Sequence, residues 1–303
     1  MMFFSVIITT YNAENFLVDA LNSLKNQTFQ DFELIITDDD STDQTLDICR
    51  KWLAENSDFH ARSKIIESPI NTGISANVNR GLKAASGEWI HVLSGDDVLI
   101  ENALENVRKF VEENPNISIF QGVSAVYSND FSESNLIGTL SENYKTSDFF
   151  NLSANEQYRL LLDHCHVVAP AVFYKKSSVE SVGFCDESIP MIDDWPLFLN
   201  FTKHGYKFYF LNQILVKYRQ HNQSIVNENK GLLVDDLHRK TRPVYRIYIA
   251  PNIGFFKKIK YYSNYIFKEI LYRFFNSKNN PIAVSMLFIW RLFKPPFLTK
   301  KNS

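Results

Sequence analysis

The chain has 303 residues, of which 45% are hydrophobic, so it is long enough and apolar enough to bury a large core. Its three cysteines, Cys49, Cys165 and Cys185, form no CxxC pair, which argues against a disulfide framework or a zinc site and favours a reducing compartment. The net charge of −2 is unevenly spread, because residues 239–303 hold fourteen Lys or Arg against one acid, Glu269, which gives +13 there and leaves −15 on residues 1–238.

The first part of the chain alternates strand patterns with helix patterns. Short apolar runs predict strands at residues 3–10, 33–37, 64–68 and 88–94. Apolar residues at helical spacing predict the intervening helices at 13–26, 46–53, 74–85 and 104–111. Because no basic leader precedes the first apolar run, we expect a strand there and no signal peptide. The alternation predicts an α/β fold with a mostly parallel central sheet flanked by helices.

The pattern changes after residue 118. Residues 117–128 read as a strand, and residues 128–153 are polar with poor periodicity. Further along, the sequence predicts helices at 155–164 and 194–205 and strands at 171–176 and 206–221. No linker or repeat interrupts this series. We therefore predict one domain over residues 1–238, followed by a basic and aromatic tail over residues 239–303.

Polar residues follow the first four predicted strands, at the edge where parallel sheets bind ligands. These strand ends carry residues 9–12, 38–40, 68–71 and 94–97, and five carboxylates lie among them. In the stretch IITDDDSTD an ordinary helix cap would account for one or two of the three aspartates. Neither GxGxxG nor GxxxxGK[ST] occurs, so a dinucleotide fingerprint and a P-loop are both excluded.

Four ordered segments carry a family resemblance. They are SVIITTYNAENFLVDALNSLKNQTFQDFELIITDDDSTDQT, NTGISANVNRGLKAASGEWIHVLSGDD, DDWPLFLNFTKHGY and VKYRQHNQS. Over about residues 3–225 the chain resembles the inverting glycosyltransferases of family 2, in particular those that make bacterial surface polysaccharides such as capsule or O-antigen. The resemblance implies a GT-A fold with a Rossmann-like sheet, here with a helical C-terminal extension.

The resemblance also implies the residues that bind the donor. Asp39 matches the position whose carboxylate accepts the N3 hydrogen of a uracil or thymine ring. Thr9 and Tyr11 match the base-binding strand end, although Tyr11 is alternatively a core aromatic. Asp38 would support this loop or contact the nucleotide. Asp40 stands where relatives usually have Gly, so we expect a positive φ there.

A donor diphosphate near so many carboxylates implies a divalent cation, Mn²⁺ or Mg²⁺. By resemblance, Asp97 would bind the metal and Asp96 the ribose or the metal, whereas a GDD triplet without that context is usually a turn. His221 matches a histidine that approaches the metal or diphosphate in many relatives. A structural role is the alternative for this single histidine.

Two positions depart from the family pattern. Ser94 replaces an Asp that begins the acidic motif in many relatives, and Val78 replaces an Arg of the NxGxxxxRN stretch. The loss of the Arg leaves the phosphate clamp to Arg80, to Lys83 or to the metal. Asn79 matches the family's Asn and would contact the nucleotide sugar, with a helix-surface amide as the alternative.

Direct displacement at the sugar requires a base that takes the acceptor hydroxyl's proton. Asp194 resembles the second acid of the family's ED motif and is the expected base, with Asp193 as the second choice. A helix N-cap explains the same residues, and the two roles are compatible, since Pro196 suits a first helical turn. His164 and His166 could line the acceptor pocket.

The tail interleaves Lys and Arg with aromatic residues over residues 255–275 and 281–297. This pattern predicts helices that lie on a membrane surface, because long basic side chains reach headgroups while rings sit at the boundary. The apolar run over residues 281–290 is about half of the roughly 20 residues that a spanning helix needs. A packed helix pair, a homo-oligomer interface and RNA binding are alternatives, and nucleic acid is the least favoured.

We therefore expect an enzyme that transfers a sugar from a UDP- or dTDP-type nucleotide diphosphate sugar to a glycan or lipid-linked acceptor. It would be cytoplasmic, or peripheral on the inner face of the plasma membrane. A non-catalytic nucleotide-sugar-binding scaffold is an alternative, because Ser94 and Val78 replace expected groups. A nucleotidyltransferase is a third, but the basic triphosphate clamp that it needs is not found.

Overall fold

The computed structural model describes residues 2–140, 148–221, 240–275, 282 and 285–286. The chain divides into two compact units, residues 1–221 and 222–303. The domain boundary expected at residue 238 falls within residues 222–239, outside the described residues, and stays a prediction.

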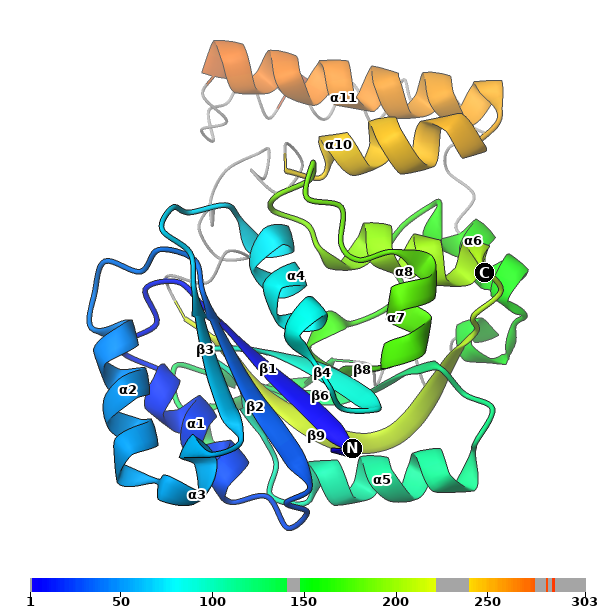
Figure 1. The fold of residues 1–303 in the computed structure, drawn as a ribbon. Helices are drawn as coiled ribbons and strands as arrows, with labels where there is room; N and C mark the ends of the chain where they lie inside the picture. Colours follow the sequence, from blue (N-terminus) through cyan, green and yellow to red (C-terminus); the bar gives the residue numbers. More distant parts are fainter. Residues whose placement is uncertain (1, 141–147, 222–239, 276–281, 283–284, 287–303) are drawn as a thin grey trace. The chain divides into compact units, whose positions relative to one another are not determined.

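The first unit is built on one central sheet (Figure 1). Its strands are β1 (Phe4–Thr10), β2 (Phe32–Asp38), β3 (Ser63–Glu67), β4 (Trp89–Ser94), β5 (Val98–Leu99), β6 (Ile119–Ser128), β7 (Leu136–Leu140), β8 (Val172–Lys175) and β9 (Phe208–Gln220). Their order is β3-β2-β1-β4-β8-β6-β9-β5, with β7 paired to β6.

The expected central sheet is confirmed, with most of its paired residues in parallel ladders and with short antiparallel pairings among the later strands. The strands β3, β2, β1 and β4 are parallel, as is the pair of β6 and β9. β8 runs antiparallel to both β4 and β6, and β7 and β5 are antiparallel to β6 and β9. Among the first four strands, helical crossovers return the chain to the same end of the sheet, which requires parallel pairing. Some of the later connections need not cross the sheet, so both strand directions occur there.

Helices cover both faces of the sheet. They are α1 (Leu17–Lys25), α2 (Thr45–Glu55), α3 (Ser57–His60), α4 (Ile74–Ala84), α5 (Ala103–Glu113), α6 (Ala154–Leu161), α7 (Lys176–Val182) and α8 (Asp194–Lys203), with 3₁₀ turns at Glu133–Asn135, Asp148–Asn151 and Ala169–Ala171. α1, α2 and α5 share one face, and α4, α7 and α8 lie on the other (Figure 1).

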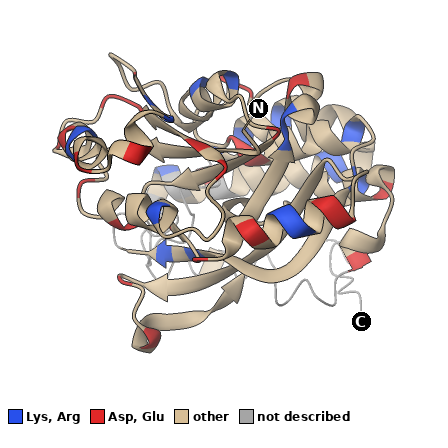
Figure 2. Ribbon diagram, turned by 60° about the horizontal axis from the view of Figure 1, so that its bottom comes forward, with Lys and Arg blue, Asp and Glu red and all other residues tan. Residues whose placement is uncertain are grey.

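Alternation along β1 explains this layering. Val6 and Ile8 belong to the core under α1, α2 and α5, whereas Ile7 faces α4. Gly81 permits the close approach of α4, because a Cβ there would lie 2.4 Å from the Ile7 side chain. Polar groups are interspersed over the covering helices (Figure 2), and on α5 Arg108 pairs with Glu105 at 3.1 Å and Glu112 at 2.6 Å.

The eight strands and helices predicted over residues 3–111 are confirmed, with boundaries that differ by a few residues. β5 and α3 were not anticipated, because two and four residues are too short to show a period. β7 lies in the stretch that we read as aperiodic, and α7 follows β8 without a clear apolar stripe.

The second unit contains α10 (Arg242–Val244), a π-helical turn (Tyr245–Ile249), a 3₁₀ turn (Ala250–Asn252) and α11 (Phe255–Phe275). The Tyr245 and Tyr261 rings stack at 4.2 Å, and Arg242 lies over the Tyr265 ring at 4.4 Å. These contacts fold the segment before α11 back onto that helix. Most of the second predicted tail helix, at residues 281–297, lies outside the described residues. Among those that are described, we find no helix with the length and hydrophobicity to cross a membrane.

Candidate functional site

The candidate site lies where β1 and β4 end. The chain builds β2 and β3 on one side of β1 before it returns to β4 on the other side, which is the switch point where α/β sheets bind ligands. Thr9 lies opposite both Thr37 and Ser94 in the sheet register. The polar strand ends therefore meet at one edge, as the sequence predicts.

Asp38 is buried and holds the loops together. Its carboxylate accepts hydrogen bonds from the Thr10 hydroxyl at 2.7 Å, the Ser41 hydroxyl at 2.6 Å and the Ser41 N–H at 2.9 Å. Its backbone carbonyl accepts the Ser68 N–H at 2.9 Å. Of its two expected roles, the geometry matches support of the loop.

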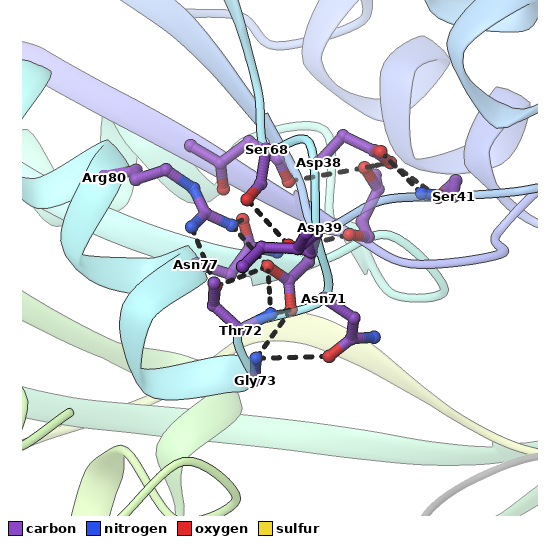
Figure 3. Close-up of polar contacts among 12 residues, drawn as sticks. Asp38, Asp39, Ser41, Ser68, Asn71, Thr72, Gly73, Asn77 and Arg80 are labelled. Atoms are coloured by element: carbon purple, nitrogen blue, oxygen red, sulfur yellow. Dashed lines mark hydrogen bonds and ion pairs between the residues drawn. The ribbon is translucent and has the colours of Figure 1, made fainter. Parts of the chain in front are cut away.

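Asp39 is buried in a dense network of donors (Figure 3). It accepts hydrogen bonds from the Thr72 N–H and hydroxyl, from the Gly73 N–H at 2.8 Å and from an Arg80 guanidinium nitrogen at 2.6 Å. Burial alone would raise its pKa, but these bonds hold it below its ordinary value. In this state Asp39 anchors the 71–73 loop, and its contact with a nucleobase stays a prediction.

Asp40 has the positive φ expected of it, and Tyr11 lies at the surface, where its contact with a base stays a prediction. Tyr11 is 53% exposed, so it is not a core aromatic and its ring is free to stack on a ligand. Thr9 is half-buried, and its carbonyl accepts the Gly95 N–H at 3.0 Å. Asp40 has a φ of +68°, and Asn12, beside Tyr11, has a φ of +50°. Asn12 fixes its turn by accepting the Thr42 N–H at 2.9 Å.

The structure brings Asp96 and His221 together. The His221 Nε2 atom lies 3.0 Å from an Asp96 carboxylate oxygen, and the imidazole packs on the Phe16 ring with centroids 4.2 Å apart. Asp96 is partly exposed, whereas the Asp97 side chain is almost fully buried. The contact of His221 with a metal or a diphosphate stays a prediction.

The Asp97 side chain is buried and contacts the backbone of β9, instead of being exposed at the strand-end edge. Its carboxylate accepts the Arg219 N–H at 2.8 Å. Burial, and then the Asp96 charge, raise the pKa of Asp97 well above its usual value. Metal binding by Asp97 would require this carboxyl to leave the strand that it holds, so its ligand role stays a prediction.

Arg219 organises this edge, and sequence reasoning assigned it no role. Its guanidinium is buried and donates to the Asp96 carbonyl at 2.8 Å, the Asn129 carbonyl at 2.6 Å and the Asp19 carboxylate at 2.6 Å. It also lies over the Phe131 ring at 4.1 Å. The sequence places Arg219 within a predicted strand, two residues before His221. It does not show which residues Arg219 contacts, because they are far away in the sequence.

A divalent cation fits Asp96 and His221 only in part. An oxygen and a nitrogen ligand 3.0 Å apart form an incomplete set, and the described residues contain no group of three or more His, Cys, Asp or Glu side chains placed to hold a metal. Mg²⁺ usually takes one or two carboxylates and completes its shell with substrate phosphates and water. The donor set therefore suits a cation that binds together with a diphosphate.

The two basic residues of α4 that could hold the leaving phosphate both have acidic partners, and a phosphate contact by either stays a prediction. Val78 is buried, Arg80 is held by Asp39, and Lys83 pairs with Glu187 at 3.3 Å. Asn79 is 2% exposed, and its amide donates to the Cys185 carbonyl and the Glu187 carboxylate while its oxygen accepts the Cys185 N–H. Asn79 therefore holds the 185–187 loop through hydrogen bonds, and its contact with a nucleotide sugar stays a prediction.

Asp193 and Asp194 begin α8 at the same side as the Asp39 loop. Gly73 packs against Pro190, three residues before Asp193, and the Ser75 N–H donates to the Pro190 carbonyl at 3.2 Å. Burial, followed by the Asp194 charge, raises the pKa of Asp193 to about 7. Burial likewise raises the pKa of Asp194, whose carboxylate accepts the Trp195 N–H at 2.6 Å. A raised carboxyl pKa suits a general base near neutral pH.

His164 and His166 lie in a loop near Asp194. The Trp195 indole N–H donates to the Leu161 carbonyl at 2.8 Å, which links the start of α8 to the chain just before this loop. Burial first, and then the Asp194 charge, raise the pKa of the intervening Cys165 thiol. The two imidazole centroids are 3.8 Å apart. Burial, and then His164, lower the pKa of His166 to about 4, so its ring is neutral at pH 7. Their expected place beside an acceptor stays a prediction.

Comparisons with known proteins agree with these features. The family model described as glycosyl transferase family 2 matches residues 5–181. Minor teichoic acid biosynthesis protein GgaB of Bacillus subtilis is 31% identical over 195 residues, which cover 63% of this chain and 20% of GgaB. The Escherichia coli enzyme named UDP-Glc:alpha-D-GlcNAc-diphosphoundecaprenol beta-1,3-glucosyltransferase WfaP is 28% identical over 232 residues, 76% of this chain and 82% of WfaP. The chain thus spans only about a fifth of GgaB.

Among solved structures, residues 1–349 of S. aureus TarS in complex with UDP-GlcNAc match with a TM-score of 0.57. The identity is 20%, and the match covers 90% of this chain and 73% of that one. A longer TarS structure is covered to 44%. At this identity the likeness establishes a shared fold.

Proposed function

The chain belongs to glycosyl transferase family 2 and has its GT-A fold, and from that premise we propose that it moves a sugar from a nucleotide diphosphate sugar to a hydroxyl group with inversion. The single observation that carries the proposal is the juxtaposition of Asp96 and His221 at the switch-point edge. A partly exposed carboxylate and an imidazole there match the needs of a cation that neutralises a leaving diphosphate.

Each part of the edge has a separate task in this mechanism. Tyr11, 53% exposed, stacks on the base, and the loop that Asp39 anchors surrounds it. Asp96 and His221 would hold Mn²⁺ or Mg²⁺, which would supply positive charge to the leaving diphosphate. Asp194, at the start of α8, takes the proton of the acceptor hydroxyl as the new glycosidic bond forms.

The donor is of the UDP or dTDP type, and the acceptor is a glycan or a lipid-linked sugar in bacterial surface-polysaccharide synthesis. The TarS structure was solved with UDP-GlcNAc, and the name of WfaP specifies a UDP-sugar and a diphosphoundecaprenol acceptor. A lipid-linked acceptor also suits the basic tail, which we propose holds the enzyme against the cytoplasmic face of the membrane.

Calorimetry with UDP and the Asp194→Asn variant tests this function. We expect UDP to bind with Mn²⁺ present, Mn²⁺ alone to bind weakly, and His221→Ala to reduce binding of the pair. Asp194→Asn should retain UDP binding and lose sugar transfer by about 10²-fold or more. Undiminished transfer by Asp194→Asn would refute the assigned base.

A non-catalytic scaffold is the second candidate. It is favoured by the buried Val78 and by the engagement of Arg80 with Asp39, which leave Lys83, paired with Glu187, as the remaining basic residue of α4 for the leaving phosphate. Binding of nucleotide sugars without turnover, across a full panel of donors and with either metal, would favour this role.

A further inference from the structure

A cavity of about 690 Å³ lies in the first unit, apart from the loops of Asp39 and Asp194. Four segments form it: α1, the residues at and after β5, residues 130–132 after β6, and β9. Its volume is within the range of about 300–1,000 Å³ typical of small-molecule sites. The lining residues on which its chemistry depends are Asp19, Asn22, Asn26, Glu101, Phe131 and Lys217.

Several lining groups retain hydrogen-bonding capacity. The Asn22 side-chain oxygen accepts the Trp52 indole N–H at 2.9 Å, while no described residue accepts a bond from its amide nitrogen. One Asp19 oxygen accepts from Arg219, and the side chain is still 55% exposed. Asn26 and Glu101 are exposed, and their side chains contact no hydrogen-bonding partner among the described residues. The cavity wall thus offers both hydrogen-bond donors and acceptors.

The charges of the lining residues and their spacing disfavour two other ligand classes, phosphates and metal ions. The carboxylates of Asp19, Glu101 and Asp130 outnumber the one lining cation, Lys217, which disfavours a phosphate or a nucleotide. The Lys217 ammonium lies over the rings of Tyr127 at 5.4 Å and Phe131 at 6.0 Å. The carboxylates are also too dispersed for a metal, because no described group of three or more ligating side chains converges. A neutral ligand with many hydroxyls satisfies these constraints.

We propose that this cavity binds a neutral saccharide segment of the acceptor glycan, away from the sugar that receives the transferred residue. Amides and carboxylates pair with adjacent hydroxyls, and Phe131 in the cavity wall offers an apolar surface to the C–H face of a sugar ring. This inference rests on the proposed function for the identity of the acceptor.

One residue joins the cavity to the candidate metal site. Arg219 donates to Asp19 in the cavity wall and to the Asp96 carbonyl at the strand-end edge, both through one buried guanidinium. A glycan held in the cavity therefore lies within one side chain of the edge where the donor diphosphate binds. This proximity favours an acceptor glycan over an unrelated sugar.

Saturation-transfer NMR on the full chain tests the proposal, with cellotriose, maltotriose and chitotriose as probes and UDP calorimetry as a second readout. The variant Asn26→Ala/Glu101→Ala removes two exposed lining groups, and the matched control Asn116→Ala/Glu113→Ala alters two exposed residues outside the cavity. We expect at least one probe to bind, its affinity to fall at least about fivefold in the cavity variant only, and UDP affinity to be unchanged in both.

The two readouts separate the possible failures. Absence of binding by all three probes, or equal binding by the cavity variant and the wild type, overturns the saccharide site while UDP binding continues to support the proposed function. Loss of probe binding in the cavity variant, in a protein that binds no nucleotide sugar, supports the saccharide site and overturns the proposed function.

Discussion

Asp193 and Asp194 are two adjacent carboxyl groups whose proton affinity depends on each other. Burial, and then the neighbouring charge, bring the pKa of Asp193 to about 7, and the pair therefore takes up a proton as the pH falls through neutrality. A general base must be unprotonated, and burial raises the pKa of Asp194 as well, so the acidic limb of sugar transfer should lie at higher pH than an ordinary aspartate would give. Asp193→Asn leaves a single carboxyl without a titrating neighbour, which should take up its proton below the upper step of the pair and so shift the acidic limb of the pH–rate profile to lower pH.

Asp58→Asn, on the exposed helix α3, is the control and should leave the pH–rate profile unchanged. An acidic limb that stays in place in Asp193→Asn would contradict the coupling.

The same proton linkage affects the stability of the folded protein. A carboxyl whose pKa is raised by folding makes the unfolding free energy decline as the pH rises from about 4 toward 7. Asp193→Asn should therefore raise the melting temperature more at pH 8 than at pH 4.

Asp40 shows how a backbone requirement can be read from one residue. Its φ of +68° costs a non-glycine residue about 1–2 kcal/mol, which Gly avoids at the expense of greater unfolded-state entropy. Asp40→Gly should thus change the unfolding free energy by less than about 1 kcal/mol and leave UDP affinity intact. Asp40→Val should destabilise by about 1–2 kcal/mol in urea titrations, and equal stability of the two variants would contradict this.

At this scale the sequence predicted which residues gather but not what each one contacts. Resemblance and strand order place Asp39, Asp96 and His221 at the edge. The sequence does not reveal that Asp39 is saturated by the Thr72–Gly73 loop, or that Arg219 connects Asp96 to Asp19, because these contacts join segments up to 200 residues apart. Long-range polar partners have no local periodic signal.

The helix α4 and the loop before α8 form one structural element that positions Asp194. Asn79 makes three hydrogen bonds to the 185–187 loop, and its removal would leave the buried Cys185 N–H and C=O without that partner. Each unsatisfied buried group costs about 1–3 kcal/mol. Asn79→Ala should therefore lower the unfolding free energy by at least about 2 kcal/mol in chemical denaturation.

Asn106→Ala, on α5, is the matched control and should stay within about 0.5 kcal/mol of the wild type. If Asn79 instead served mainly as a nucleotide contact, Asn79→Ala would weaken UDP binding and leave the unfolding curve unchanged. The sequence favoured that second role, because a match to a family motif does not reveal that the side chain faces the protein.

Elements were predictable in proportion to their length and periodicity. The βαβ units from β1 to α5 have clear apolar patterns, and they supply most of the candidate site. The antiparallel pairings of β8, β7 and β5 were missed, because strand direction depends on how a connection crosses the sheet and not on the composition of the strand.

At the scale of the whole molecule, the second unit carries both an excess of positive charge and exposed apolar side chains. Exposed side chains on α11 recur at helical spacing, at Phe255, Ile259, Tyr262, Ile266, Ile270 and Phe274. Such a stripe over 21 residues, next to the lysines of the first turns, has the composition of a helix that lies in a membrane interface. Residues 239–303 carry +13, which adds attraction to anionic lipid.

Vesicle flotation with the full chain tests this membrane role. The chain should float with vesicles that contain phosphatidylglycerol, float poorly with phosphatidylcholine alone, and lose binding as salt is raised. Lys257→Glu/Lys258→Glu/Lys260→Glu should weaken binding to anionic vesicles at least tenfold, since each Lys near the surface contributes about 1 kcal/mol. Ile259→Asp/Ile266→Asp should also weaken it, by removing apolar contact without changing the lysines. If the chain self-associates without vesicles and both variants abolish this, the stripe is instead an oligomer interface. Membrane binding cannot produce such an effect, because no lipid is present.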